Sequence, residues 1–358
     1  MLNLAILFGG LSSEHEISCI SAASVLRNTD RGQYRVYPVG ITRDGRWFLY
    51  GDADPDKIQD GSWERELSLA PAQLSPDRGI HGLTVLRGQG VEHIRLDCVF
   101  PVLHGFGGED GTVQGLCTLA GIPFVGPGVS ASANSMDKSL TKAIVARTGV
   151  RQAAYYLALA PDFSRDPQGT AQAAADAVGS WPIFVKPCSS GSSVGVARAN
   201  NLDELRAGLE EAFRWDSKVL AEEFIDGHEI EVAVLGNDSP TASVAGEIAP
   251  AQDFYTFDAK YRDESSKLYI PAHIPDAAME TVRENAVRIF TALGCKGLSR
   301  VDFFCTYQGD EIVFNEINTI PGFTSISMYP KLFAYAGIPF PELIDRLVAL
   351  AMEEGAHG

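Results

Sequence analysis

Strand and helix patterns alternate over residues 1–126. An apolar run at residues 2–8 ends at a Gly-Gly turn, and a helical pattern follows it. A second strand is predicted over residues 34–41, a buried strand over residues 96–103, and a helix near residues 112–120. Strands that alternate with helices in this way form a parallel sheet with helices on both faces. The pattern therefore predicts an α/β domain at the start of the chain.

Two local features of this region carry predictions of their own. Ser13 followed by Glu16 is a capping-box pattern, which predicts that the first helix starts there. Residues 52–91 are polar and contain Gly and Pro, which indicates an irregular insertion.

The length of the chain bears on its division into domains. A chain of 358 residues is too long for one ordinary core. We predict three units, at residues 1–126, 127–225 and 226–358. The last unit contains a long polar segment, residues 249–267, and ends with two alternating strands and a helix.

Charge and cysteine content exclude some classes of protein. The net charge of −17 argues against a nucleic-acid partner, because phosphate binding requires a basic face. Small anionic substrates stay possible, since a few Lys and Arg side chains in a cleft can outweigh the negative electrostatic field of the protein as a whole. Without a signal peptide or an apolar run of about 20 residues, we expect no membrane partner. Scattered cysteines without a CxxC pair indicate buried thiols in a reducing cytoplasm. They are Cys19, Cys98, Cys117, Cys188, Cys295 and Cys305.

The two alternating strands, at residues 299–307 and 311–317, are the most informative part of the sequence. Side chains two apart along a strand share a face, so antiparallel pairing of these strands brings Asp302, Glu316 and Asn318 together. An all-oxygen cluster of this kind suits Mg²⁺, which takes one or two carboxylates together with nucleotide phosphates. The alternative is a solvated sheet face that carries acids by chance.

A Gly/Ser-rich loop supplies a second signal. Lys186 is followed by CSSGSSVG, where small residues such as Ser192 and Ser193 allow backbone N–H groups to approach phosphate oxygens. The loop lacks the GxxxxGK[ST] pattern, and such loops are often only flexible. Lys138 is the candidate cation for the other side of a nucleotide, although it also fits a surface helix.

A predicted strand at residues 219–224 leads into an apolar hinge. Main-chain groups near Phe224 and Ile225 would bind adenine, with Glu229 accepting hydrogen bonds from ribose hydroxyls. Glu222 is the other acid that we assign as a nucleotide contact. Three acids of this region also fit ordinary solvated strand residues: Glu222, Glu223 and Glu231.

Eight motifs in order resemble the D-alanine–D-alanine ligases of the ATP-grasp superfamily. They are GGLSSEHEIS, HGFGGEDGTVQG, SMDKS, VKPCSSGSSVGV, EEFIDGHEIEVAVLG, FYTFDAKY, RVDFF and NEINTIPGFTSISMYP. The resemblance covers essentially the whole chain and is weakest at residues 52–91. Related vancomycin-resistance ligases share most of the motifs.

The resemblance implies a fold and a reaction. The fold is ATP-grasp, an N-terminal α/β parallel-sheet domain followed by two α+β domains that sandwich ATP. ATP phosphorylates the carboxylate of one D-alanine, and the amine of a second D-alanine attacks the acyl phosphate, which gives a cell-wall precursor. The resemblance also implies two Mg²⁺ ions, for which Mn²⁺ can substitute, and a cytoplasmic homodimer; activation by K⁺ stays open. Residues 249–267 are expected to form a lid that excludes water.

Site roles follow from the resemblance residue by residue. Glu14 is expected to bind the ammonium group of the first substrate and to form a hydrogen-bonded group with Ser192 and Tyr261. His104 is expected beside that substrate, although a loop histidine with satisfied hydrogen bonds is the alternative.

The remaining roles concern the reacting groups. Lys260 is expected to reach the γ-phosphate, and Asn315 is assigned to ATP binding. Arg300 and the backbone N–H of Gly322 are expected to stabilise the oxyanion of the tetrahedral intermediate. Ser327 is expected to bind the carboxylate of the second substrate.

Two residues bear on the choice of acceptor. Tyr261 resembles the dipeptide-forming members of the family. Met328 resembles the D-alanine enzymes, since D-serine-using relatives tend to place an arginine there and a methionine suits a methyl group. We predict D-alanine as the acceptor, with D-serine as the alternative.

Two further hypotheses differ in class. Another ATP-grasp carboxylate–amine ligase would share Lys186, Asp302 and Glu316 but would not need HGFGGEDG or Glu14. A nucleotide-binding module without turnover would show a broken metal or oxyanion set. Both sets are intact in the sequence, which argues against this hypothesis; their residues are Asp302, Glu316, Asn318, Arg300 and Gly322.

Overall fold

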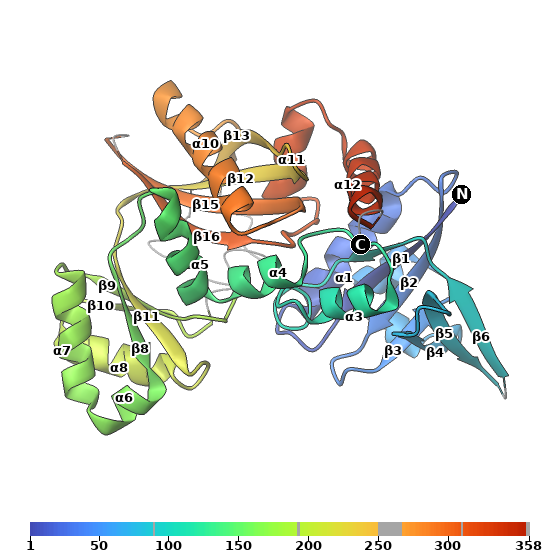
Figure 1. Cartoon of the computed structure of the whole chain (residues 1–358), viewed down its shortest axis with the longest axis horizontal. Coiled ribbons are helices and arrows are strands. Elements are labelled where there is room, and N and C mark those ends of the chain that lie inside the picture. The colour runs from blue at the N-terminus through green and yellow to red at the C-terminus, as the bar shows by residue number, and fades with distance from the viewer. Residues whose placement is uncertain (89, 192–193, 250–266, 309–310, 356–358) are drawn as a thin grey trace.

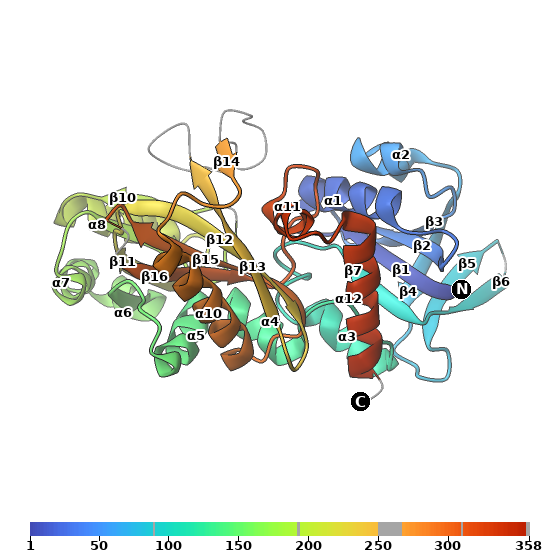
Figure 2. The same ribbon diagram turned by 90° about the horizontal axis from the view of Figure 1, so that it is seen from above.

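The structure, a computed structural model, describes residues 1–88, 90–191, 194–249, 267–308 and 311–355. Within these ranges, the strands form sheets of seven, four and five strands. Figures 1 and 2 show the seven-stranded and four-stranded sheets at opposite ends of the molecule, with the five-stranded sheet between them. The boundaries of the three units remain a prediction. Each unit has its own sheet, but one hydrophobic core contains residues of both the N-terminal and the C-terminal unit.

The N-terminal sheet is mixed, not parallel throughout. Its order is β6-β5-β4-β3-β2-β1-β7, in which β1 pairs in parallel with β2 and β7 while β3 to β6 add antiparallel strands. Short connections join β2 to β3, β4 to β5 and β5 to β6, and only antiparallel neighbours can be joined so tightly. The antiparallel neighbours β3 and β4 are joined by the longer segment of residues 51–68. The strands are β1 Leu2–Gly9, β2 Tyr34–Ile41, β3 Trp47–Tyr50, β4 Leu69–Leu74, β5 Gly82–Arg87, β6 Gly90–Arg95 and β7 Cys98–Pro101.

Residues 52–91 therefore do not form an irregular insertion. Their side chains alternate between buried and exposed in β4, with Ala70, Ala72 and Leu74 inside the core. That period of two is the pattern of a half-buried strand, and the Gly and Pro residues obscured it. The helices of this unit are α1 His15–Asn28, α2 Pro55–Gln59, a 3-10 turn Ser62–Arg65 and α3 Thr112–Ala120.

The capping box predicted for the first helix is also wrong. Helix α1 begins at His15, and Glu14 occupies the N-cap position without a side-chain cap. The N–H of Glu14 donates to Ser12 Oγ over 3.1 Å. Glu16 instead pairs with Arg43, with 3.0 Å between the guanidinium and the carboxylate. The turn before α1 is therefore organised by Ser12 and not by Ser13.

The central unit contains an antiparallel sheet of order β10-β9-β11-β8. Helices α7 and α8 pack on it through a core that includes Ala171, Leu205 and Val185. Its elements are α4 Val129–Met136, α5 Lys138–Val145, a 3-10 turn Ala146–Thr148, β8 Tyr155–Leu159, α6 Ala160–Arg165, α7 Pro167–Val178, β9 Ile183–Pro187, β10 Ala197–Ala199, α8 Leu202–Ala212 and β11 Lys218–Glu223.

The third sheet is antiparallel, with the order β14-β13-β12-β15-β16. Helix α10 covers it through a core that includes Val282, Phe290 and Phe303. Its elements are β12 Gly227–Gly236, β13 Thr241–Ala249, β14 Lys267–Tyr269, α10 Asp276–Ala292, β15 Gly297–Thr306, β16 Ile312–Asn318, α11 Met328–Tyr335 and α12 Phe340–Gly355.

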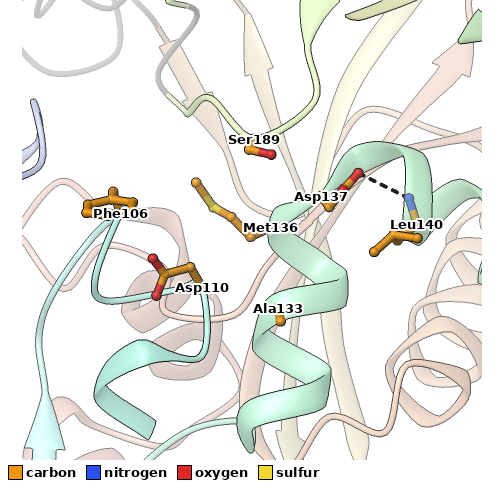
Figure 3. A pocket seen from close by; sticks show the side chains of 7 residues that line it. All are labelled: Phe106, Asp110, Ala133, Met136, Asp137, Leu140 and Ser189. Atoms are coloured by element: carbon orange, nitrogen blue, oxygen red, sulfur yellow. Dashed lines mark hydrogen bonds between the residues drawn. The ribbon is translucent and has the colours of Figure 1, made fainter. Parts of the chain in front are cut away.

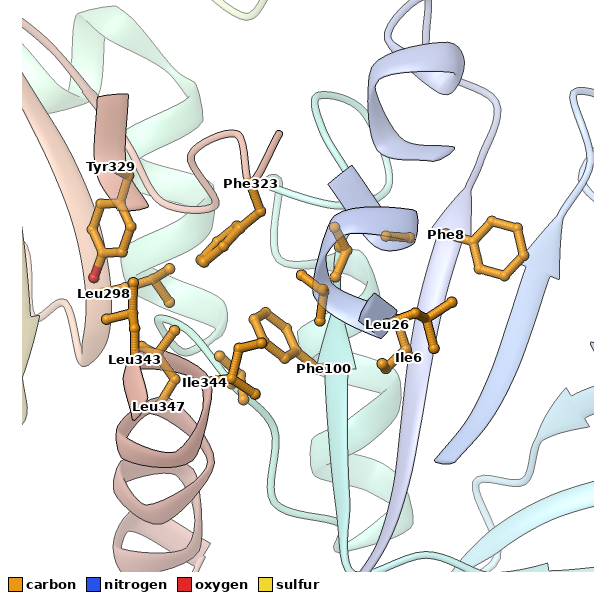
Figure 4. Close-up of a cluster of buried hydrophobic side chains, with 14 of the residues drawn as sticks. Ile6, Phe8, Leu26, Phe100, Leu298, Phe323, Tyr329, Leu343, Ile344 and Leu347 are labelled. Atoms are coloured by element: carbon orange, nitrogen blue, oxygen red, sulfur yellow. The ribbon is translucent and has the colours of Figure 1, made fainter. Parts of the chain in front are cut away.

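The C-terminal helix joins the two ends of the chain in one core. Helix α12 contacts α1 and β7 of the N-terminal unit and also β12 and β15. Figure 4 shows Leu343 and Leu347 facing the side of the cluster that contains Phe100, with Phe323 above them. The ring of Phe323 meets that of Phe100 edge-on at 5.6 Å. This shared core fixes the loop after β16 against the N-terminal sheet, where the site forms.

Candidate active site

The acidic pair predicted from the alternating strands lies at the centre of the site. Strands β15 and β16 pair antiparallel, with Asp302 opposite Glu316 and Arg300 opposite Asn318. The predicted pairing is therefore confirmed. The register then shifts, so that Phe303 faces Phe314 and Asn315 is the extra residue of a β-bulge.

The bulge changes which side chains point into the site. Phe314 and Ile317 are buried, whereas Asn315 and Glu316 are both only partly buried. Two consecutive residues of a regular strand would point to opposite faces. Because the bulge interrupts that alternation, Asn315 joins the acidic face, and its Oδ1 accepts a hydrogen bond from Lys186 Nζ over 3.2 Å.

Arg300 is fixed by two acids of the same sheet. Its Nε and one terminal nitrogen donate to the two oxygens of Asp302 over 2.8 and 2.6 Å. The guanidinium also lies 3.2 Å from Glu231. A bidentate contact fixes both the position and the plane of the guanidinium. Glu231 is only 6% exposed and takes part in the site, so the interpretation of this acid as a solvated strand residue is wrong.

The acidic face has the donor set for Mg²⁺. Asp302 and Glu316 supply carboxylates, and Asn318 adds an amide whose Nδ2 donates to Asp302 over 3.0 Å. Among the described residues there is no group of three His, Cys, Asp or Glu side chains that could hold a metal ion by themselves. Two carboxylates and an amide oxygen leave positions for phosphate oxygens, which is the coordination that Mg²⁺ prefers. The residues therefore fit the ion that the sequence predicted.

Two lysines face the acids from the central unit. Lys138, the first residue of α5, lies 3.8 Å from Glu316 and donates to the backbone carbonyl of Ser190 over 2.8 Å. Lys186 on β9 pairs with Glu222 and contacts Asn315. The two lysines thus tie the start of the Gly/Ser-rich loop to the acidic face, which is the arrangement that the sequence predicted for the two sides of a nucleotide.

The hinge after β11 is apolar, as a site for adenine requires. The Phe224 ring stacks on Phe184 at 5.6 Å with an angle of 15°. Ile225 is 8% exposed and packs with Val313 and Phe304 of the facing strands. Glu229 lies on β12 opposite Phe304. The hinge residues predicted for adenine therefore lie beside the strands that carry the acids.

His104 joins three segments through both of its ring nitrogens. Nδ1 donates to the carbonyl oxygen of Ile320 over 3.0 Å, and Nε2 accepts from Ser21 Oγ at 3.1 Å. The N–H of Phe323 donates to the same hydroxyl over 3.2 Å. Burial lowers the pKa of His104 in spite of the nearby Glu14 carboxylate. The neutral ring therefore positions the loop after β16, and its geometry matches the alternative of a histidine with satisfied hydrogen bonds.

Glu109 performs a similar bridging role that the sequence analysis missed. Its two oxygens accept hydrogen bonds from the N–H of Gly105 over 2.8 Å and from the N–H of Ile320 over 3.1 Å. Burial, and then the charge of Glu14, raise the pKa of Glu109 to about 7. The GGEDG motif was the available signal, although only the fold shows that its glutamate reaches the loop after β16.

Glu14 lies where the N-terminal and central units meet. It is 8% exposed, and a Cβ atom added to Gly105 or Gly191 would come within 2.8 or 3.0 Å of its Oε2 atom. Side chains at these two positions would therefore displace the carboxylate. Ser192, Ser193, Lys260 and Tyr261 lie outside the described residues.

The residues predicted for the second substrate lie in the loop before α11. Ser327 Oγ accepts from the N–H of Thr324 over 3.0 Å, and a Cβ atom on Gly322 would come within 2.7 Å of that hydroxyl. Met328 is buried in the core and packs against Gly246 of β13. Its environment supports a packing role.

A cavity of about 290 Å³ adjoins the site between the N-terminal and central units. Figure 3 shows Phe106 and Asp110 on one side, the end of α4 on the other, and Ser189 above. Asp137 at its edge caps α5 and pairs with Lys218. The other acid of the lining, Asp110, accepts hydrogen bonds from the N–H groups of Gly107 and Thr112, so both carboxylates that line the cavity already have partners.

The fold and the site together define an ATP-grasp ligase. Family models described as "D-ala D-ala ligase N-terminus" and "D-ala D-ala ligase C-terminus" match residues 3–127 and 144–349, and the chain belongs to the D-alanine–D-alanine ligase family. It is 49% identical over 350 residues to a D-alanine–D-alanine ligase of Clostridium novyi, with 98% of both chains covered. A second such relative, from Clostridium acetobutylicum, is 47% identical over 348 residues, with 97% of both chains covered.

Solved structures agree with this assignment. The VanG D-Ala:D-Ser ligase of Enterococcus faecalis is 39% identical with a TM-score of 0.88, and the match covers 98% of this chain and 99% of that one. The D-alanine–D-alanine ligase of Coxiella burnetii is 34% identical with a TM-score of 0.85, and the match covers 100% and 97%. Among the described residues, no helix is long and apolar enough to span a bilayer.

Proposed function

We propose that this protein joins two D-alanine molecules at the expense of ATP, which yields D-alanyl-D-alanine, ADP and phosphate for peptidoglycan synthesis. The observation that carries the proposal is the pairing of Asp302 opposite Glu316 with Arg300 beside them. The curated relatives named D-alanine–D-alanine ligase support it across nearly the full chain.

The first step activates a carboxylate that has no usable leaving group. A carboxylate oxygen of the first D-alanine attacks the γ-phosphorus, the bond from this phosphorus to the bridging oxygen breaks, and ADP leaves with the electron pair. Glu14 binds the ammonium group of this substrate, and His104 and Glu109 position the loop against which it lies. Lys138 and Lys186 offset the phosphate charge, so that catalysis is mainly positioning and neutralisation.

The second step forms the peptide bond. The neutral amine of the second D-alanine attacks the acyl carbon and gives a tetrahedral intermediate with one oxyanion. Arg300 and the N–H of Gly322 stabilise this oxyanion. The carbon–oxygen bond to phosphate then breaks, inorganic phosphate leaves, and the amine proton passes to it or to solvent. Ser327 binds the acceptor carboxylate.

Asp302, Glu316 and Asn318 would bind two Mg²⁺ ions, which Mn²⁺ can replace. When bound, the ions neutralise the β- and γ-phosphate oxygens and withdraw charge from the transferring phosphoryl group. Several assignments remain proposals. The lid at residues 249–267, the homodimer and the roles of Ser192, Ser193, Lys260 and Tyr261 rest on the resemblance. The unit boundaries near residues 126 and 225 rest on the sequence pattern, and the cytoplasmic location rests on the resemblance and on the scattered cysteines.

An assay with purified protein, ATP, Mg²⁺ and D-alanine tests the proposal. We expect ADP release that depends on D-alanine, together with D-alanyl-D-alanine detected by mass spectrometry, and the assay is repeated with and without K⁺. ADP release without any dipeptide would contradict the proposal. Omission of D-alanine is the control.

D-Serine is the second candidate acceptor because the VanG structure, titled a D-Ala:D-Ser ligase, matches this chain with a TM-score of 0.88. An equimolar mixture of D-alanine and D-serine separates the two acceptors. We expect D-alanyl-D-alanine as the main product. A predominance of D-alanyl-D-serine would overturn the acceptor assignment and leave the ligase chemistry intact.

A further inference from the structure

A second lysine of helix α5 is buried beside the proposed nucleotide site. Lys142 follows Lys138 by four residues, and residues at this spacing lie on the same side of a helix. Its side chain is 2% exposed. An ammonium group is costly to remove from water unless an anion compensates for it. The identity of that anion links Lys142 to ATP binding.

The compensating anion is Glu222, which two lysines share. Lys142 Nζ lies 2.8 Å from one carboxylate oxygen in an ion pair that lacks the alignment of a hydrogen bond, and Lys186 contacts the other oxygen. Lys142 also lies over the Tyr155 ring, 5.0 Å from its centroid. All three charged side chains are enclosed, since Glu222 is 4% exposed and Lys186 is also largely covered.

The charges of this triad do not cancel. Burial alone would raise the pKa of Glu222, but the two ammonium groups hold it below its ordinary value, so the carboxyl is ionised. Burial is the largest single influence on Lys186 and opposes its charge, but Glu222 and then Glu316 together raise the pKa of this lysine. Burial lowers the pKa of Lys142, while its contact with Glu222 opposes that change. With both lysines protonated, the triad carries one excess positive charge.

The excess charge lies on the side of the triad that faces the metal-binding strand. Lys186 reaches Asn315 of β16, and Glu316 is a further anion that acts on it. Lys142 contacts the other carboxylate oxygen of Glu222, and Arg151 is a further cation that acts on it. Without Lys142, the charge of Lys186 would be used to neutralise Glu222. With it, Lys186 can interact with an added polyanion.

We propose that Lys142 is a positioning residue for ATP: it neutralises Glu222 and so keeps the positive charge of Lys186 available to the nucleotide phosphates. This inference deepens the proposed ligase function and rests on it. Lys142 itself does not contact the nucleotide. Its effect is therefore expected in the KM for ATP and in nucleotide affinity, and not in the KM for D-alanine.

The test is a double-mutant cycle in the full-length enzyme. Lys142→Met is expected to raise the KM for ATP at least tenfold and to weaken binding of a non-hydrolysable ATP analogue similarly, with the KM for D-alanine within twofold. In a Glu222→Gln background the carboxylate is absent, so the same Lys142→Met change should alter the KM for ATP by less than threefold. Lys142→Arg keeps the charge and should remain within threefold of wild type.

Controls separate this role from general destabilisation. Lys57→Met removes a lysine that pairs with Glu66 in the N-terminal unit, 2.8 Å apart, and should leave both KM values unchanged. Thermal unfolding is recorded for each variant. If Lys142→Met does not fold, the inference is judged from Lys142→Arg and from the two variants that contain Glu222→Gln.

Two results would overturn the inference: an unchanged KM for ATP in Lys142→Met, or an equal effect of that change in both backgrounds, which is the signature of a packing role. Failure of wild-type protein to release ADP with D-alanine would instead contradict the proposed ligase function. The two failures are therefore distinguishable.

Discussion

Asp302 and Glu316 lie directly opposite each other on the β15–β16 ladder. Like charges in this position repel, so the pair destabilises the sheet unless cations lie nearby. Arg300 contacts Asp302, and Lys138 lies 3.8 Å from Glu316. The site thus keeps two acids together by surrounding them with cations, and a bound divalent ion would complete the neutralisation.

Glu316→Gln tests this arrangement directly. The amide retains one oxygen but loses the charge, so we expect dipeptide synthesis to fall at least about a hundredfold and the Mg²⁺ requirement to rise. The melting temperature should not fall, because one member of a like-charge pair is removed. Coupled ADP-release rates over a Mg²⁺ titration provide the measurement. Glu280→Gln, on the exposed face of α10, is the control, and undiminished turnover in Glu316→Gln would refute the metal site.

Arg300→Lys tests the oxyanion role. The guanidinium donates to both oxygens of Asp302 and also lies beside Glu231, a geometry that a single ammonium group cannot reproduce. We expect kcat to fall by about 10²–10³-fold, the usual effect of losing an oxyanion donor. The KM for D-alanine should stay within a few-fold, as measured by steady-state kinetics. A higher KM at unchanged kcat would mean that Arg300 binds the ground state only.

The strands β15 and β16 show which features of the site the sequence pattern can predict and which it cannot. Alternation in RVDFFCTY correctly placed Asp302 on the face of the acids, because the period of a strand is local information. The bulge at Asn315 could not be predicted, since it depends on the register that the partner strand adopts. That bulge directs Asn315 and Glu316 to the same face, where Asn315 meets Lys186.

Other differences have the same origin in tertiary contacts. The position of Glu231 in its strand could not show whether this acid is solvated or belongs to the site, because only the pairing of β12 with β15 brings it to Arg300. The Ser13–Glu16 capping pattern failed because α1 begins at His15 after a turn that Ser12 organises, and Glu16 pairs with Arg43. Lys142 gave no sequence signal beyond its spacing from Lys138, because its proposed role depends on the carboxylate of Glu222, which is 80 residues away in the sequence.

Glu109 predicts a pH dependence of stability. Its pKa is raised in the folded protein to about 7 from an ordinary 4.5, so between these values the folded state binds more protons than the unfolded state. This residue's contribution to the free energy of unfolding is therefore full below about pH 4.5 and is lost as the pH rises through about 7.

Glu109→Gln isolates that contribution because the amide does not titrate. We expect the free energy of unfolding of wild type to fall relative to the variant between about pH 5 and pH 8, as measured by urea denaturation. The variant also loses an acceptor for one of the two backbone N–H groups, so a constant offset is expected at all pH values. If the free energy of unfolding varied with pH in the same way in wild type and in Glu109→Gln, a raised pKa of Glu109 would be excluded. Glu92→Gln on β6 is the control.

Ser327→Ala tests the acceptor subsite. The Ser327 hydroxyl already accepts from the N–H of Thr324 and lies 2.8 Å from the Thr324 hydroxyl. These two contacts fix the orientation of the Ser327 hydroxyl. A hydrogen bond to a charged carboxylate contributes about 1.5–3 kcal/mol, which corresponds to roughly a tenfold or greater loss of acceptor affinity. The two D-alanine sites can be separated by the dependence of rate on D-alanine concentration.

In Ser327→Ala we expect only the weaker of the two D-alanine constants to rise, with kcat reduced less than fivefold and the KM for ATP unchanged. Ser239→Ala, on an exposed turn, is the matched control. Loss of the Thr324 contact could also disturb Gly322, whose backbone lies against Ser327. That disturbance would lower kcat together with oxyanion stabilisation, so a kcat effect as large as that of Arg300→Lys would show that Ser327 acts through Gly322 and not on the acceptor carboxylate.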